Sequence, residues 1–164
     1  MLLSIGTLDG SAECYIKCRR NETRTKRMKT LFTSCYGRSK LLPSEFPQVR
    51  TSRGVPNWWH PAKRIDAMPL APNDRTWQDK ANWAKHYRAQ LEALWRSGVL
   101  ERTIDNLPDN SVLMCFEANP CDCHRSLLAA FLVEKGLAVV KEYDTKLAAQ
   151  KKQEPPTNPQ LFLL

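Results

Sequence analysis

The stretch from Ser111 to Gly136 constrains the fold more than any other part of the chain. It begins with SVLMCFE, a mostly apolar run of strand length, which the strand breaker Asn119-Pro120 soon follows. Strand alternation divides this run between two faces, with Val112, Met114 and Phe116 on one and Leu113, Cys115 and Glu117 on the other. Both faces are largely apolar, which is typical of a strand covered on both sides in a parallel sheet.

A helix is predicted directly after the loop. Asp122 is a suitable N-cap residue, and Gly136 is a suitable terminator. Apolar residues recur between them at helical spacing, at Leu127, Leu128, Phe131 and Leu132. Residues 137–140 then read as the next strand, and strand–helix–strand implies a parallel pair with a crossover. The sequence therefore predicts an α/β fold, a single three-layer domain with a mostly parallel sheet.

Chemically reactive side chains gather at the carboxyl end of the predicted central strand. Glu117 lies at the strand end, and Cys123, His124 and Arg125 open the following helix. Open α/β sheets bind ligands at this edge, and the free N–H groups of a helix start favour an anion. We therefore expect the functional site in this loop.

Length and composition limit the remaining possibilities. The chain has 164 residues, enough for one domain, and no window approaches the roughly 18 apolar residues of a membrane span. No signal-peptide core precedes the domain, so we expect a cytoplasmic protein with no membrane partner, whose cysteines are thiols or metal ligands. Half of the formal charge of +8 falls in residues 1–29. We expect residues 1–27 to be a disordered basic extension, 28–143 the domain and 144–164 a disordered tail.

The middle of the chain supplies further elements. Strands are predicted at 31–36 and 49–53, and one helix at 76–97. The apolar face of that helix is predicted to be core and holds Trp77, Tyr87, Leu91 and Trp95, so Trp95→Ala should cost roughly 3–5 kcal/mol. Polar side chains at the ends of the two strands, together with Trp58, suit a phosphate or base-stacking surface and include Ser34, Arg38 and Arg53.

Several chemistries are compatible with the cysteines. The candidate metal ligands are Cys115, Cys121, Cys123 and His124, but structural zinc sites usually separate two distant pairs of ligands. Adjacent helical residues such as Cys123 and His124 also point apart, so we expect no metal site. A phosphatase-type loop is excluded because the residue six positions before Arg125 is Asn119 rather than Cys. A nucleophilic Cys–His pair needs His60 or His124 next to a cysteine.

The central stretch resembles a known family. The run VLMCFE, a short loop and then CHRSLLA closely resemble the signature of the domain of unknown function 488 family. The segments LFTSCYG, RGVPNW and LAP, with the long helix that holds Tyr87, are similar to its earlier parts, so the resemblance covers about residues 28–143. It implies a Rossmann-like α/β domain and no particular activity.

Three functions remain open. The first is an enzyme acting on a phosphate-bearing substrate, a nucleotide or nucleic acid, without a cofactor. Glu117 would be its general acid/base, assisted by Cys123 or His124. Its anion-binding residues would be Arg125, Arg53, Trp58, Arg38 and Ser34. Two structural alternatives stay open: Arg125 pairs internally with Glu117 and closes the loop without a ligand, and Trp58 only packs its loop onto the core. The second is a non-catalytic nucleic-acid-binding module, and the third is a small structural or metal-binding domain.

Overall fold

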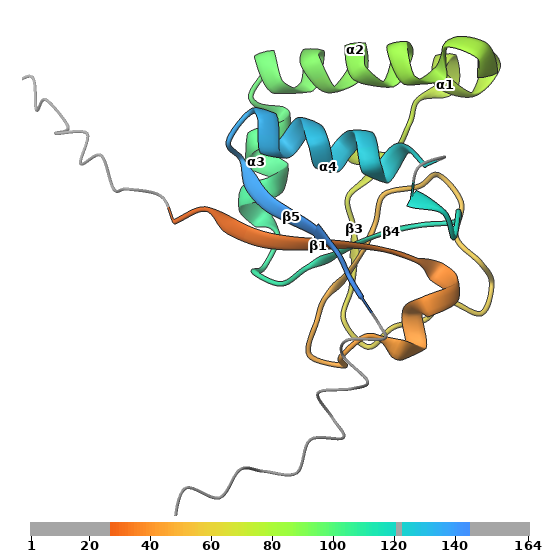
Figure 1. The fold of residues 1–164 in the computed structure, drawn as a ribbon, viewed down its shortest axis with the longest axis vertical. Helices are drawn as coiled ribbons and strands as arrows, with labels where there is room; N and C mark the ends of the chain where they lie inside the picture. Colours follow the sequence, from red (N-terminus) through yellow and green to blue (C-terminus); the bar gives the residue numbers. More distant parts are fainter. Residues whose placement is uncertain (1–26, 121–122, 145–164) are drawn as a thin grey trace, which may run out of the picture.

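One parallel sheet forms the centre of the protein. The computed structural model describes residues 27–120 and 123–144. Five strands, in the order β3-β2-β4-β1-β5, form the sheet, and every neighbouring pair is parallel. They are β1 (Lys29–Cys35), β2 (Gln48–Arg50), β3 (Arg64–Asp66), β4 (Val112–Cys115) and β5 (Ala138–Glu142) (Figure 1).

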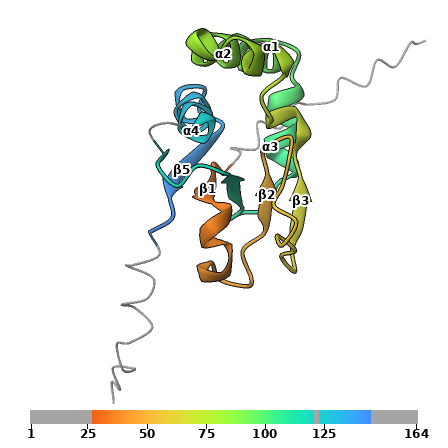
Figure 2. The same ribbon diagram turned by 90° about the vertical axis from the view of Figure 1, so that its right-hand side faces the viewer.

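Helices cover one face of this sheet. The α-helices are α1 (Asp74–Gln78), α2 (Trp83–Arg96), α3 (Val99–Asn106) and α4 (His124–Glu134). Helix α4 contacts β1, β4 and β5, and α2 contacts both α3 and α4. Figure 2 shows α1, α2 and α4 above the sheet and the short 3-10 helix η1 (Tyr36–Leu41) below it. Two further 3-10 helices are η2 (Met68–Leu70) and η3 (Lys80–Asn82).

Each face of the sheet has its own apolar core. Leu113 belongs to the cluster beneath the helices, whereas its neighbours Val112 and Met114 belong to the cluster on the other face, with Tyr36 and Trp59. This alternation follows from the two-residue period of a strand. The Rossmann-like α/β fold expected from the sequence is confirmed, and the sheet is parallel throughout.

One strand of the sheet, β3, was not predicted from the sequence. Strand β3 is only three residues long and lies at the edge of the sheet, beside β2. Its residues, Arg-Ile-Asp, contain a single apolar side chain, so the segment shows no apolar run. The four other strands match the predicted ones within a few residues.

The helix predicted over residues 76–97 is interrupted. Helix α1 ends at Gln78, and the carboxylate of Asp79 then accepts a hydrogen bond from the Asn82 amide, which starts a new turn before α2. Tyr87 and Leu91 are buried as expected, but Trp95 is 39% exposed, so its assignment to the core is wrong. All three residues lie in α2, where the helical period of about 3.6 residues places Trp95 about 80° from Tyr87, at the edge of the buried face. The side chain of Trp77 lies outside the described part of the structure.

Three other expectations concern residues that the structure leaves undescribed. The extension predicted at 1–27 and the tail at 144–164 lie almost wholly outside the described residues, and so does the expected N-cap Asp122. Of the helices that the structure describes, none is long and apolar enough to span a membrane.

Two truncations in α2 test its orientation. Leu91→Ala should lower the free energy of unfolding by about 2–5 kcal/mol, because it leaves a cavity in the core. Trp95→Ala should cost only about 1 kcal/mol, chiefly from the lost contact with the Lys135 ammonium, which lies 4.1 Å from the centre of the indole. Urea denaturation of both variants measures the difference, and equal losses would contradict this orientation.

Candidate functional site

Four side chains meet where β4 ends and α4 begins. The donor atoms of Cys115, Glu117, Cys123 and His124 all lie within 4.8 Å of one another. We refer to these four residues as the thiol cluster. Cys115 is the last residue of β4, and Glu117 follows two residues later. The sequence placed both on one face of the strand, and the structure brings Cys123 and His124 to that face.

Cys123 joins the cluster because it precedes the helix rather than forming part of it. Its backbone is extended, with φ −120° and ψ 140°, and its Sγ caps α4 by accepting a hydrogen bond from the Arg125 amide (3.4 Å). Side chains of adjacent residues diverge on a helix, but this extended N-cap lets Cys123 and His124 turn toward one point. The expectation that the two point apart is therefore wrong.

The carboxylate of Glu117 joins the two thiols. The Cys115 thiol donates to Glu117 Oε2 at 2.7 Å, and Cys123 Sγ lies 3.1 Å from the same oxygen. Cys115 Sγ also lies 3.3 Å from His124 Nδ1. Both cysteines and the histidine are buried, whereas Glu117 is partly exposed. Glu117 is therefore the member of the cluster that solvent reaches.

A backbone carbonyl fixes the proton of His124. His124 Nε2 lies 2.8 Å from the carbonyl oxygen of Thr51, which can only accept a hydrogen bond. We therefore assign the proton to Nε2, which leaves the lone pair of Nδ1 directed at Cys115 when the imidazole is neutral. The ring of Tyr87 meets the imidazole edge-on, with centres 5.5 Å apart, and restricts its rotation. Of the two histidines proposed as partners of a cysteine, His124 is the one in the cluster.

The two thiols differ in acidity. The neighbouring Cys115 thiol lowers the pKa of Cys123, against the effect of burial, and contacts with His124 and the Arg125 amide act in the same direction. The pKa of Cys115 is raised, first by its hydrogen bond to Cys123 and then by burial. Burial also opposes ionisation of Glu117, but hydrogen bonds from Cys115 and Cys123 outweigh it, so its pKa lies below the ordinary value.

Arg125 holds the loop between β4 and α4 from inside. Its side chain is 0% exposed, and its two terminal nitrogens donate to the carbonyl oxygens of Glu117 and Ala118. Nη2 also lies 3.2 Å from Glu142 Oε1 at the end of β5, and Nε has no partner among the described residues. The guanidinium thus positions the backbone that carries Glu117. Its expected contact with an anion stays a prediction.

The other predicted anion-binding residues lie in different surroundings. Ser34 is fully buried, and its hydroxyl has no partner in the described residues. The Arg38 side chain is 41% exposed and lies 4.0 Å from Glu142 Oε1. Arg53 donates to the carbonyl oxygen of Pro72 and pairs with Asp74. Their roles in ligand binding also stay predictions, as does that of Trp58.

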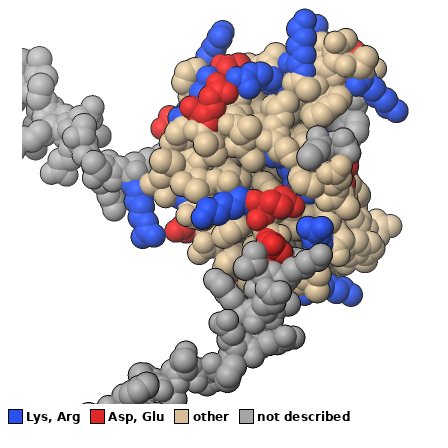
Figure 3. Space-filling view, viewed as in Figure 1, with Lys and Arg blue, Asp and Glu red and all other residues tan. Residues whose placement is uncertain are grey.

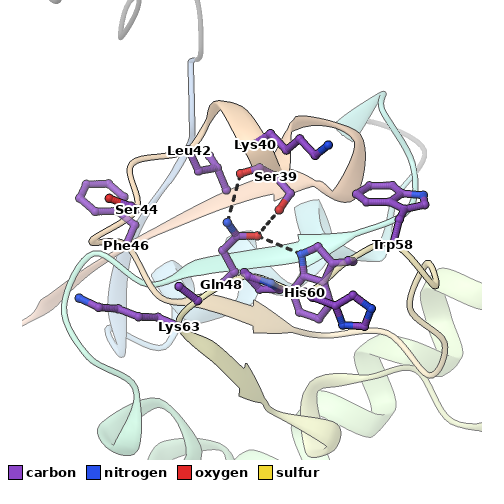
Figure 4. A pocket seen from close by; sticks show the side chains of 12 residues that line it. Ser39, Lys40, Leu42, Ser44, Phe46, Gln48, Trp58, His60 and Lys63 are labelled. Atoms are coloured by element: carbon purple, nitrogen blue, oxygen red, sulfur yellow. Dashed lines mark hydrogen bonds between the residues drawn. The ribbon is translucent and has the colours of Figure 1, made fainter.

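Trp58 borders a separate pocket of about 310 Å³ (Figure 4). Basic and aromatic residues line it, among them Lys40, His60 and Lys63, and none of the described lining residues is acidic. Gln48 connects two parts of the pocket wall, because its side-chain oxygen accepts hydrogen bonds from Ser39 Oγ (2.6 Å) and from Trp59 Nε1 (2.9 Å). His60 therefore belongs to this pocket and not to the thiol cluster.

Sequence reasoning missed several residues that shape the cluster. Thr51 acts through its backbone carbonyl, so the identity of its side chain carries no signal for this contact. Glu142 ends β5 and lies two residues beyond the strand predicted at 137–140, so the sequence prediction did not include it. Cys121, a candidate metal ligand, lies outside the described residues.

Comparison with known proteins supports the family resemblance. The model of a family described as "Domain of unknown function DUF488" matches residues 64–132, a range that includes the whole thiol cluster and Arg125. The description names no activity. No curated protein and no solved structure matches the chain.

Replacing Arg125 should show how strongly it braces the loop. Arg125→Met should lower the free energy of unfolding by about 3 kcal/mol, because it leaves two carbonyl oxygens and Glu142 without their buried donor. Arg38→Met is the matched control, because the exposed Arg38 side chain lies near the same Glu142 oxygen. This substitution should lower the free energy of unfolding by at most about 0.5 kcal/mol. Chemical denaturation of both measures the contrast, and a loss below about 1 kcal/mol for Arg125→Met would rule out the bracing role.

Proposed function

We propose that this member of the DUF488 family is an enzyme acting on a phosphate-bearing substrate, a nucleotide or nucleic acid, with Glu117 as its general acid/base. One observation carries the proposal. Glu117 is the solvent-accessible member of an otherwise buried group of reactive side chains at the carboxyl edge of a parallel sheet. Ligands bind α/β sheets at this edge.

The state of Glu117 suits proton transfer. Glu117 Oε2 lies 2.7 Å from Cys115 Sγ and 3.1 Å from Cys123 Sγ, so the carboxylate is held at the solvent-facing side of the cluster, where it can accept a proton from a bound nucleophile. The loop backbone that carries it is clamped by Arg125, and rigid placement of the base favours catalysis. Cys123 contacts the Glu117 carboxylate, and His124 contacts Cys115, the other thiol bound to that carboxylate. In the proposed enzyme both residues assist by holding the carboxylate in place.

Positive charge at the same edge supports a phosphate-bearing substrate. Arg38 follows β1 and Arg53 follows β2, so both lie beyond the carboxyl ends of parallel strands, as the cluster does beyond β4. Their side chains are partly exposed. Helix α4 begins beside the cluster with its amide groups directed at that edge, where the helix dipole also favours an anion.

A non-catalytic nucleic-acid-binding role is the second candidate, and the pocket at Trp58 favours it. Trp58 is 56% exposed and shares the pocket with Lys40 and Lys63, a combination that can stack a base and bind its phosphate. On the face seen in Figure 3, however, basic side chains stand beside acidic ones rather than in one continuous basic surface. This distribution favours a small ligand over a long nucleic acid.

A comparison of wild type with Glu117→Gln tests the enzymatic proposal. Thermal melting with inorganic phosphate, nucleotides and oligonucleotides identifies compounds that raise the melting temperature by mass action. Mass spectrometry then follows conversion of those compounds. Wild type should bind and convert at least one of them, whereas Glu117→Gln should bind it and convert it at least about 100-fold more slowly.

Two further variants sharpen this test. Glu92→Gln removes a surface carboxylate on α2 and should convert substrate like wild type. Trp58→Ala tests the second candidate: if that candidate holds, the variant should bind oligonucleotides more weakly than wild type, and neither protein should convert any compound. The enzymatic proposal fails if no compound of the panel is bound, or if Glu117→Gln converts it at the wild-type rate.

A further inference from the structure

We propose that the thiol cluster is a zinc site, in which Cys115 Sγ, Cys123 Sγ and His124 Nδ1 bind the ion and Glu117 faces an open fourth position. Zinc binding follows from these donors alone. Only its use in catalysis, as the group that would activate a water molecule beside Glu117, rests on the function proposed above.

The spacing of the donor atoms fits a tetrahedral ion. Zinc–sulfur and zinc–nitrogen bonds of about 2.3 and 2.0 Å place neighbouring donors roughly 3.3–3.8 Å apart. Cys115 Sγ lies 3.3 Å from His124 Nδ1, and all donors of the cluster lie within 4.8 Å of one another. Shifts of about 1 Å or less would therefore bring the three buried donors around one ion.

The imidazole is already oriented as a ligand. A metal-binding histidine usually donates its second N–H to a carboxylate or a backbone carbonyl, which directs the other nitrogen at the metal. His124 does this through Nε2 and the carbonyl of Thr51, at 2.8 Å. Thr51 is in turn fully buried, and its hydroxyl donates to the carbonyl of Met114 at 2.8 Å. The histidine is thus tied to the strand that carries Cys115.

Both thiols are set in rigid and solvent-free places. Cys115 and Cys123 are 1% exposed, one at the end of a central strand and one at the cap of α4. The Arg125 amide donates to Cys123 Sγ, a contact that stabilises a thiolate, the form in which cysteine binds a metal. Both residues are free thiols, so both are available to an ion.

The donor chemistry selects zinc. Magnesium and calcium take oxygen ligands, whereas two thiolates with an imidazole suit zinc in tetrahedral coordination. Catalytic zinc sites keep three protein ligands and an open position. The partly exposed Glu117 lies 2.7 Å from one thiol and 3.1 Å from the other, so its carboxylate borders the side of the cluster that solvent reaches.

Metal analysis of the purified full-length chain tests the assignment. Protein made in zinc-supplemented medium and purified without chelators should contain about one zinc ion per chain by elemental mass spectrometry. Cys123→Ser and His124→Gln should each lose most of it. The glutamine amide can still donate to the Thr51 carbonyl but provides no imidazole nitrogen for the ion.

Three variants serve as controls. Cys35→Ser alters another buried thiol, on the residue of β1 that pairs in register with Cys115, and should keep its zinc. His86→Gln alters a histidine that pairs with Asp79 outside the cluster and should also keep it. Glu117→Gln should keep its zinc because the three other donors remain, and loss of zinc in that variant would overturn the open fourth position.

A second measurement works even if a variant fails to fold. A chelator should lower the melting temperature of the wild-type protein, and added zinc should restore it. Cobalt(II) added to the metal-free protein should produce the visible absorption of tetrahedral thiolate coordination. A chain that binds neither zinc nor cobalt, or that carries iron instead, would overturn the proposal.

These results are separable from those on the enzymatic proposal. If the protein contains zinc but converts no phosphate compound, the enzymatic proposal is refuted and the zinc proposal is supported. If the protein converts a phosphate compound but binds no zinc, the zinc proposal is refuted and the enzymatic proposal is supported. The chelator therefore has to be tested on melting as well as on turnover.

Discussion

The buried guanidinium of Arg125 is the interaction on which the organisation of the site depends. It joins the loop after β4, through the carbonyls of Glu117 and Ala118, to Glu142 at the end of β5. A charge with no exposed surface is costly to bury unless its donors are paired, so these contacts hold the loop in one arrangement. The same arrangement presents Glu117 to the two thiols. A group expected to bind a ligand thus acts, in the described structure, as a brace for the residues around it.

The thiol cluster concentrates titratable side chains where the fold offers little solvation. Buried polar groups are destabilising unless satisfied, and here they satisfy one another: a thiol donates to a carboxylate, and an imidazole faces the same thiol. Such clusters are more typical of functional sites than of structural cores. The enzymatic proposal and the zinc proposal both start from this arrangement. The first uses the partial exposure of Glu117, and the second uses the orientation of His124 by Thr51.

Local patterns predicted the framework better than its details. Alternation along β4 correctly divided Val112 and Met114 from Leu113, because a strand repeats every two residues whatever surrounds it. The helical period over 76–97 was less reliable. Tyr87 and Trp95 lie in the same helix, α2, and the helical period of about 3.6 residues places Trp95 about 80° from Tyr87, at the edge of the buried face, where it is exposed. The edge strand β3 escaped detection since three residues carry no measurable pattern.

Two features of the site can be predicted from the amino-acid sequence alone: Cys115 and Glu117 share one face at a strand end, and Cys123, His124 and Arg125 follow at a helix start. Periodicity and helix-terminating signals depend only on neighbouring residues, and so they can be read from the chain. Tertiary structure decided that the thiols, the imidazole and the carboxylate converge. That convergence requires the extended backbone of Cys123, the carbonyl of Thr51 and the carboxylate of Glu142. The last two come from distant segments that only the packed sheet brings to the site, because contacts between residues far apart in the chain leave no local pattern.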